Sequence, residues 1–197
     1  MPTTTSWIDG RSYDSPFTHP VGWVGRMAGR FMLWTNRHQK EILPLVAAGP
    51  GQRVLEIGYG AGGLARLLCA TGARVCGVDP SPDMRLLAAR RAPAADLRLG
   101  TASDTGFPDR AFDRVVSVNT VAIWPELAPA VRELHRVTRP GGRALIAWHG
   151  GSAPSRVARG LRMSDAGLER VRAALGDVFH RVDREELSGL TVFVAHR

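Results

Sequence analysis

Residues 54–79 read VLEIGYGAGGLARLLCATGARVCGVD, and this stretch contains the pattern that decides the fold. The mostly apolar run 53–57 predicts a buried strand, and apolar residues at helical spacing follow over 62–69. A second apolar run, 74–78, predicts the next strand. A strand, a helix and another strand in this order form the unit from which parallel sheets are built.

The alternation of strands and helices continues to the end of the chain. It predicts a Rossmann-like, doubly wound α/β fold, with a mostly parallel sheet of seven strands and helices on both faces. The last two apolar runs are separated by a charged segment that is typical of a turn, so we expect an antiparallel C-terminal hairpin. Further strands are predicted at 97–99, 112–118, 143–148, 178–182 and 190–195, and helices after the cap Ser81, at 126–137 and from Ser164 to 175.

The N-terminal part of the chain has a different pattern. Apolar residues recur at helical spacing over 21–34, and a second helix is predicted over 37–48 with a kink near Pro44. We therefore expect two parts, an N-terminal helical cap of residues 1–49 and an α/β core of residues 50–197.

The glycine-rich segment after the first strand of the core favours a nucleotide-like ligand. Gly58 and Gly60 let the chain turn sharply and let a ligand approach the backbone, and Asp79 can accept hydrogen bonds from ribose hydroxyls. With Gly63 these glycines also fit G-x-G-x-x-G, so a nicotinamide dinucleotide is a competing ligand. Glu56 favours S-adenosylmethionine instead, because an acid before the first glycine suits a charged methionine end and would repel a pyrophosphate.

Four ordered motifs carry a resemblance to a known family. They read VLEIGYGAGGLARLL, VCGVDPSPDM, GFPDRAFDRVVSVNTVAIWPE and LHRVTRPGGRALIAWH. The chain resembles the class I S-adenosylmethionine-dependent methyltransferases, and among them the small bacterial group described as methyltransferase type 11. The resemblance is strong over residues 50–150 and loose elsewhere. It implies an enzyme that binds S-adenosylmethionine and transfers its methyl group by in-line displacement.

The resemblance also implies roles for individual residues. Glu56, Gly58 and Gly60 would line the methionine part of the cofactor, and Asp79 would hold the ribose. Thr101 departs from the acid that this group often has beside the adenine edge. The other cofactor-binding positions that it implies are Pro80 and Met84 against the adenine, Ala102 beside the adenine edge, Asn119 near the amino-acid end, and Asn36 closing over the cofactor.

Methyl transfer needs alignment and desolvation, and it needs a general base only when the acceptor starts protonated. His149, just past the fifth strand of the core, is the first candidate base, and His38 is a second candidate. Trp34, Trp124 and Trp23 are candidates for a substrate pocket, because an aromatic face attracts a sulfonium or an amine. Structural packing is the competing explanation for each of these residues. No spacing typical of metal ligands is visible.

We expect the acceptor to be a small molecule, with secondary metabolites among the candidates. A nucleic-acid or protein methyltransferase, a nicotinamide-dependent reductase and a cofactor-binding homologue that transfers no methyl group are the alternatives. The net charge of +8 and the pI of about 11.0 would suit a nucleic-acid partner. However, the basic residues are scattered, and the segment 119–122, NTVA, lacks both prolines of the Asn/Asp-Pro-Pro-aromatic motif of enzymes that methylate nucleobase amines.

Smaller signals bear on the cellular context. Cys69 and Cys76, the only cysteines, lie in apolar segments, which indicates buried thiols in a reducing bacterial cytoplasm. No apolar run approaches the length of a membrane span, and the first residues have no secretory pattern. The oligomeric state is left open, a homodimer included. Because few residues separate the fifth strand from the next helix, we expect residues 1–49 to cover the site.

Overall fold

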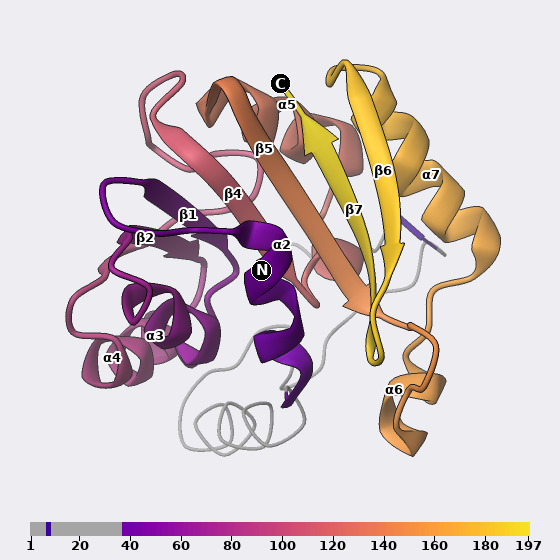
Figure 1. Cartoon of the computed structure of the whole chain (residues 1–197), viewed down its shortest axis with the longest axis horizontal. Coiled ribbons are helices and arrows are strands. Elements are labelled where there is room, and N and C mark those ends of the chain that lie inside the picture. The colour runs from indigo at the N-terminus through magenta and orange to yellow at the C-terminus, as the bar shows by residue number, and fades with distance from the viewer. Residues whose placement is uncertain (1–6, 9–36) are drawn as a thin grey trace.

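The computed structural model describes residues 7–8 and 37–197, and a seven-stranded sheet forms its centre (Figure 1). The strand order is β3-β2-β1-β4-β5-β7-β6, and β1 to β5 pair in parallel whereas β7 is antiparallel to β5 and β6. The predicted Rossmann-like α/β fold with a C-terminal antiparallel hairpin is confirmed. The strands are β1 (Arg53–Ile57), β2 (Arg74–Asp79), β3 (Asp96–Leu99), β4 (Phe112–Val118), β5 (Thr138–His149), β6 (Arg181–Glu186) and β7 (Leu190–His196).

Helices cover both faces of this sheet. On one face, the 3₁₀ helix η1 with α2 and α3 buries side chains such as Ile42, Val46 and Leu64. On the other face, α5 and α7 bury Leu134 and Leu175. Helix α4 lies beside α3, against β2 and β3. The helices are η1 (Arg37–Ile42), α2 (Leu43–Val46), α3 (Gly63–Cys69), α4 (Pro82–Arg91), η2 (Val121–Ile123), α5 (Leu127–Val137), α6 (Arg156–Gly160) and α7 (Asp165–Gly176).

The parallel strands all end at one edge of the sheet, the lower edge in Figure 1. The order of the strands reverses between β1 and β4, because the chain proceeds outward from β1 to β2 and β3 and outward from β4 to β5. Ile57 and Ser117 are register partners at the carboxyl ends of these two central strands. In open α/β sheets ligands bind at this point, so the segments that follow Ile57 and Ser117 are where a site is expected.

Strand β5 begins five residues earlier than predicted, at Thr138 instead of residue 143. The segment 139–142, which follows α5, forms an irregular start of the strand with a register shift against β4. Arg197 explains the difference, because its backbone carbonyl accepts from the amide of Gly141 at 2.7 Å and its amide donates to the carbonyl of Gly142 at 3.1 Å. Pairing with the last residue of the chain is a long-range contact that a local pattern does not show.

The predicted strand at 178–182 was misplaced. Strand β6 instead spans Arg181–Glu186, the charged segment that we expected to be a turn. It lies at the end of the sheet with β7 as its neighbour, so its charged side chains can stay in solvent and form pairs such as Arg184–Glu186. The apolar Phe179, before the strand, is buried beneath α7 with the core cluster of that face.

The described N-terminal residues pack directly on the sheet. The predicted second helix is divided into η1 and α2 just before Pro44, which has no amide hydrogen to donate. Ile42 and Val46 are fully buried, and Nε of Arg114 in β4 donates to the carbonyl of Val46 at 2.9 Å. The predicted helix over 21–34 lies outside the described residues, and the division of the chain at residue 49 stays a prediction.

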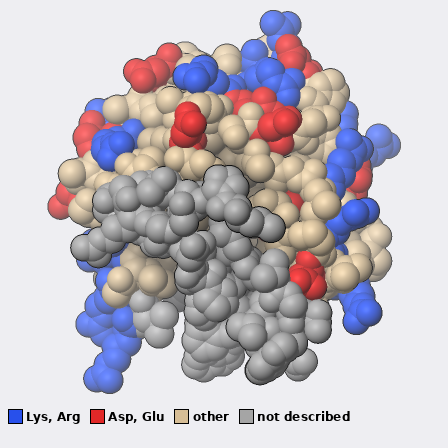
Figure 2. Space-filling model, turned by 180° about the vertical axis from the view of Figure 1, so that it is seen from behind, with Lys and Arg blue, Asp and Glu red and all other residues tan. Residues whose placement is uncertain are grey.

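Charged side chains of both signs are mixed on the surface. Figure 2 shows basic and acidic side chains interspersed on the face opposite to that of Figure 1. Some of them form exposed pairs, such as Arg98–Asp96 and Arg172–Glu169. On the visible described residues of this face, the mixture agrees with the scattered arginines of the sequence. No helix among the described residues is long and apolar enough to cross a membrane.

Candidate functional site

The segment between β1 and α3 turns sharply because three of its glycines have positive φ. The angles are +73° at Gly58, +50° at Gly60 and +78° at Gly62. A Cβ on Gly58 would lie 2.5 Å from Cγ2 of Thr120, and a Cβ on Gly62 would lie 2.8 Å from Cα of Ala88. Neighbouring protein atoms therefore require glycine at both positions, in addition to the backbone conformation.

Gly60 differs from its two neighbours in the same turn. A Cβ placed on it would meet no described atom within 4 Å. Its amide donates a hydrogen bond of 2.9 Å to Oδ2 of Asp79. The described structure therefore leaves open space beside the backbone of Gly60, as the close approach of a ligand requires.

Asp79 is buried at the carboxyl end of β2, next to the glycine turn. Its Oδ1 accepts from the amide of Ser81 at 2.9 Å, and its Oδ2 accepts from the amide of Gly60. Burial raises the pKa of this carboxyl, and the two amide donors act in the opposite direction. Because a carboxylate has about four acceptor sites, Asp79 retains capacity for further donors such as ribose hydroxyls.

Glu56 is a buried acid in β1, close to the glycine turn. It is 3% exposed, and its Oε2 has no hydrogen-bond partner among the described residues. Burial, with the negative charge of Asp79 as a smaller cause, raises its pKa from 4.5 to about 8, although the amide of Ala65 acts in the opposite direction. No cationic side chain of the described chain is among the groups that act on it. A buried carboxyl of this kind is stabilised in its charged form by a cationic ligand group.

Tyr59 is a residue of this corner that the sequence reasoning missed. Its side chain is buried, and its hydroxyl donates to the carbonyl of Arg98 at 3.1 Å. Gly77 in β2 makes room for the ring, because a Cβ there would lie 2.8 Å from Cδ1 of Tyr59. An aromatic residue between two glycines, together with a glycine in the following strand, was the signal for this packing.

Pro80 and Met84, predicted to contact the adenine, lie where α4 begins. Pro80 is exposed, whereas Met84 is fully buried and packs in the cluster that contains Tyr59. Ser81 caps α4 as predicted, since its Oγ accepts from the amide of Met84 at 3.3 Å. The adenine contacts stay predictions, and for Met84 the structure shows that the side chain also serves the core.

Thr101 and Ala102 follow β3 at the same edge of the sheet. The amide of Gly100 donates to the carbonyl of Asp79 at 3.2 Å, which places this segment beside the end of β2. Thr101 is exposed, and its Oγ1 accepts from the amide of Asp104 at 3.1 Å. Ala102 is buried in the core. The structure therefore brings the predicted adenine edge next to the predicted ribose acceptor.

The residues after β4 lie on the other side of the point where the strand order reverses, opposite the glycine turn that follows β1. Asn119 has φ of +59°, an uncommon angle for a residue other than glycine, and its amide donates to the carbonyl of Ala147 at 2.8 Å. The Oγ1 of Thr120 lies 2.6 Å from Oγ of Ser117 and accepts from Nε1 of Trp124 at 3.2 Å. Trp124 is buried by this contact and by the core, so its predicted place in a substrate pocket stays a prediction.

His149 is the last residue of β5 and is half-buried. Its ring packs edge-on against the ring of Trp148, with the centroids 5.5 Å apart. Because β5 is parallel to β4, His149 lies at the same edge of the sheet as Asn119. The position fits a group that faces a ligand at this edge, and its role as a base stays a prediction.

Trp7 also reaches this end of the molecule, which the sequence reasoning did not anticipate. Its Nε1 donates to the carbonyl of Val121 in η2 at 2.8 Å, and the guanidinium of Arg170 lies 5.1 Å from the centre of its ring. Trp7 is therefore attached just after β4. The predicted site residues Trp23, Trp34 and Asn36, and the side chain of His38, lie outside the described part of the chain.

The arrangement is suited to a ligand with both a cationic group and hydroxyl groups. Glu56 offers a buried carboxyl with no cation from the described residues, and Asp79 offers further acceptor sites. Gly60 leaves open space beside its backbone where a ligand can approach. The methionine ammonium and the ribose hydroxyls of S-adenosylmethionine have these chemical properties, so the residues present fit this cofactor.

Comparison with known proteins agrees with this geometry. Residues 55–146 match the family model described as methyltransferase domain. A malonyl-[acyl-carrier protein] O-methyltransferase of Serratia marcescens is 35% identical over 107 residues, which is 54% of this chain and 42% of that protein. A demethylmenaquinone methyltransferase of Renibacterium salmoninarum is 34% identical over 113 residues, 57% of this chain and 48% of that protein. The chain thus aligns with less than half the length of either relative.

A solved structure supports the fold independently. A phosphoethanolamine N-methyltransferase 2 of Haemonchus contortus, in complex with S-adenosyl-L-methionine, superposes with a TM-score of 0.67. The match covers 81% of this chain and 52% of that one at 19% sequence identity. At this identity the likeness is one of fold.

Proposed function

Because the chain belongs to the class I S-adenosylmethionine-dependent methyltransferases through residues 55–146, we propose that it transfers a methyl group from S-adenosylmethionine to a small-molecule acceptor. One observation carries the proposal. Glu56 is buried with an oxygen that lacks a partner among the described residues, and it lies beside Asp79, whose carboxylate can accept more bonds. A purely structural strand-to-helix turn has no need of two buried acids without a cation.

Different residues at this edge of the sheet would bind different parts of the cofactor. Glu56 would pair with the ammonium of the methionine end, and Asp79 would accept from the ribose hydroxyls. Gly60 would let the cofactor approach the backbone, and Asn119, on the other side of the point where the strand order reverses, would contact the amino-acid end. Asp79 is positioned before any ligand arrives, because the amides of Gly60 and Ser81 already fix both of its oxygens.

Bound S-adenosylmethionine supplies a methyl group on a positively charged sulfur that is already a good leaving group. The protein then contributes alignment of the acceptor and exclusion of water. His149 would remove a proton from a protonated acceptor, and its position at the carboxyl end of β5 supports this role. Trp148, beside His149, would supply apolar surface near this edge, and Trp124, which Thr120 contacts, would do so only if the ligand reached its buried ring.

The relatives support a small-molecule acceptor. Their names specify a malonyl group on a carrier protein and a demethylmenaquinone, so the acceptor groups in the two proteins are small organic groups. The surface of this chain agrees, since charges of both signs are mixed on the face in Figure 2. A nucleic-acid acceptor would favour a concentrated basic surface.

Calorimetric titration with S-adenosylhomocysteine tests the cofactor assignment. We expect Asp79→Ala to weaken binding at least about a hundredfold, because hydrogen bonds to a charged group contribute roughly 1.5–3 kcal/mol each. Asp177→Ala removes an exposed acid after α7 and is the matched control, with unchanged affinity. Undiminished affinity in Asp79→Ala contradicts the assignment.

Steady-state kinetics with an identified acceptor test the assignment of His149. If the imidazole accepts a proton from the acceptor, His149→Asn lowers kcat by roughly a hundredfold and removes one limb of its pH profile. The dissociation constant of S-adenosylhomocysteine is expected to stay unchanged, since the cofactor residues are elsewhere. An unaltered pH profile in His149→Asn assigns the histidine to packing against Trp148.

A further inference from the structure

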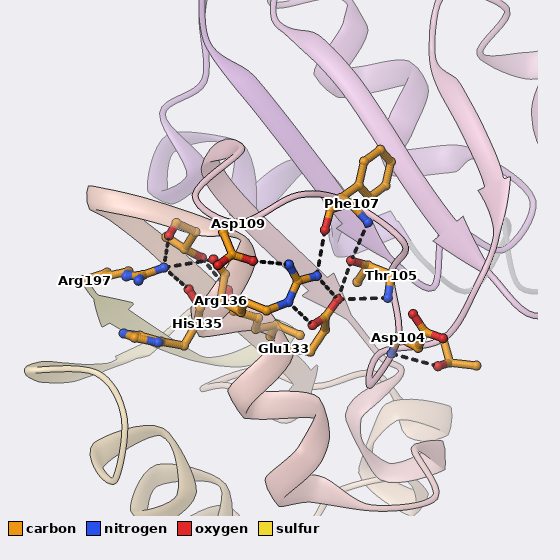
Figure 3. A network of polar contacts seen from close by, with 11 residues as sticks. Asp104, Thr105, Phe107, Asp109, Glu133, His135, Arg136 and Arg197 are labelled. Carbon is orange, nitrogen blue, oxygen red and sulfur yellow. Dashed lines mark hydrogen bonds and ion pairs between the residues drawn. The ribbon is translucent and has the colours of Figure 1, made fainter.

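Glu133, in α5, binds the segment between β3 and β4 (Figure 3). Glu133 is far in sequence from the glycine turn. Oε1 of Glu133 accepts from the amide of Thr105 at 3.0 Å and from its hydroxyl at 2.6 Å. The Thr105 hydroxyl accepts in turn from the amide of Phe107 at 3.3 Å. Residues 100–111 contain no helix or strand, so these contacts determine much of their path.

Arg136 completes the attachment of this segment to α5. Its Nε and Nη2 lie 2.7 and 2.8 Å from the two carboxylate oxygens of Glu133. Its Nη2 also donates to the carbonyl of Phe107 at 2.7 Å, and its Nη1 lies 2.5 Å from Oδ1 of Asp109. Arg197 donates to the backbone carbonyl of Arg136 at 3.0 Å, as Figure 3 shows. Glu133 therefore has a cation, bonded to both of its oxygens, and two further bonds from Thr105 that leave it little freedom to move.

The other end of the same segment reaches the candidate site. Gly100 is bonded to the backbone of Asp79, and the amide of Thr101 donates to the carbonyl of Asp104 at 3.0 Å. Ala102 is buried in the core. Thr105, which Glu133 binds, is thus three positions after Ala102. The backbone of this segment is held by hydrogen bonds at Gly100 and at Thr105.

We propose that Glu133 is a positioning residue for recognition of the adenine ring, which it achieves by holding Thr105 and thereby the backbone at Thr101 and Ala102. The inference rests on the proposed function, because it takes these two residues as the adenine edge. Thr101 is not an acid, so its hydroxyl or a backbone carbonyl must accept from the adenine amine. A neutral acceptor has to be held accurately to contribute, because a hydrogen bond weakens steeply as its angle departs from linear.

Calorimetry with two ligands separates this role from a merely structural one. S-adenosylhomocysteine carries the adenine amine, and S-inosylhomocysteine has a carbonyl oxygen in its place. We expect the wild-type chain to prefer the first compound. Glu133→Gln and Thr105→Val are expected to lower that preference roughly three- to tenfold, the fold-change of one lost hydrogen bond. General loosening of the fold would lower the affinities for both ligands by the same factor and leave the ratio of the two affinities unchanged.

The matched control is Glu169→Gln, because Glu169 pairs with Arg172 at the same i,i+3 spacing on the exposed side of α7. Its ligand ratio is expected to equal that of the wild-type chain. If Glu133→Gln fails to fold, Thr105→Val gives the result alone, since it removes one hydroxyl and keeps the shape of the side chain. A wild-type ratio in the folded variants, or no preference in the wild-type chain, overturns the proposal. Failure of the wild-type chain to bind S-adenosylhomocysteine contradicts the proposed function instead.

Discussion

Two buried glutamates in this protein have opposite surroundings. Glu133 is 8% exposed and binds Arg136 and Thr105, whereas Glu56 is 3% exposed and has an oxygen without a partner among the described residues. Burial acts to raise the pKa of both. At Glu133 the donors outweigh burial and the pKa is lowered, whereas at Glu56 the pKa is raised to about 8.

The difference indicates what each region is built for. A carboxylate that has its cation and donors stabilises the fold around it, and Glu133 fixes a segment that has no regular structure. A buried carboxyl without a cation destabilises the folded state in its charged form, and it persists where a ligand supplies the missing charge. The comparison therefore separates an acid in α5 that the chain itself pairs from an acid in β1 that we propose to bind a ligand.

The largest expected effect concerns Glu56 and the pH dependence of stability. Since its pKa is raised from 4.5 to about 8, the folded chain retains a proton that the unfolded chain releases. The free energy of unfolding of the ligand-free protein should therefore fall as the pH rises between these two values, by an amount on the order of 4 kcal/mol. Glu56→Gln removes this dependence, which urea unfolding over a pH series measures.

Ligand binding gives a second measurement on the same residue. If the ammonium of the cofactor pairs with Glu56, binding near neutral pH expels about one proton. Calorimetric titration with S-adenosylhomocysteine in buffers of different ionisation enthalpy counts that proton. Glu56→Gln should bind more weakly and show no dependence on the buffer. An enthalpy independent of the buffer in the wild-type chain contradicts the role of Glu56.

The local parts of the fold and site were predictable from the sequence. Strands β1 and β4 have the predicted bounds, and Ser81 and Ser164 cap α4 and α7 through their side chains as expected. Each of these features is determined by a few consecutive residues. The positions of Glu56 and Asp79 at one edge of the sheet follow from the same strand-turn-helix-strand order.

Features that depend on distant partners were not predictable in this way. Thr105 and Glu133 are 28 residues apart, and Thr120 lies 63 residues from Ile57, whose carbonyl it contacts. The start of β5 depends on Arg197, at the end of the chain. The placement of β6 depends on its position at the edge of the sheet, where charged residues can form a strand as well as a turn.

A smaller effect of opposite sign is expected at Glu133. Its pKa is lowered, so the stability it contributes is present above its unfolded pKa of about 4.5 and is lost as the pH falls through the folded value. Near pH 7, Glu133→Gln should lower the free energy of unfolding by about 2 kcal/mol, less than for a fully buried pair because Arg136 is partly exposed. The deficit should shrink in acid, where the wild-type carboxyl is also neutral.

Comparison with Glu169→Gln tests whether burial of the Glu133 pair determines how much the pair stabilises the fold. Glu169 and Arg172 have the same spacing and a similar contact of 2.6 Å, but both side chains are exposed. Water and salt screen such a pair, so its loss should barely change the unfolding midpoint in urea at any pH. Equal losses in Glu133→Gln and Glu169→Gln would show that the network around Thr105 adds nothing to a surface ion pair. A large loss of unfolding free energy that occurs at neutral pH in Glu133→Gln alone would show that the buried pair stabilises the fold. The stability contributed by Glu56 is expected to change with pH in the opposite direction. Together, the two results would show that a buried acid stabilises this fold only where the chain itself provides its cation.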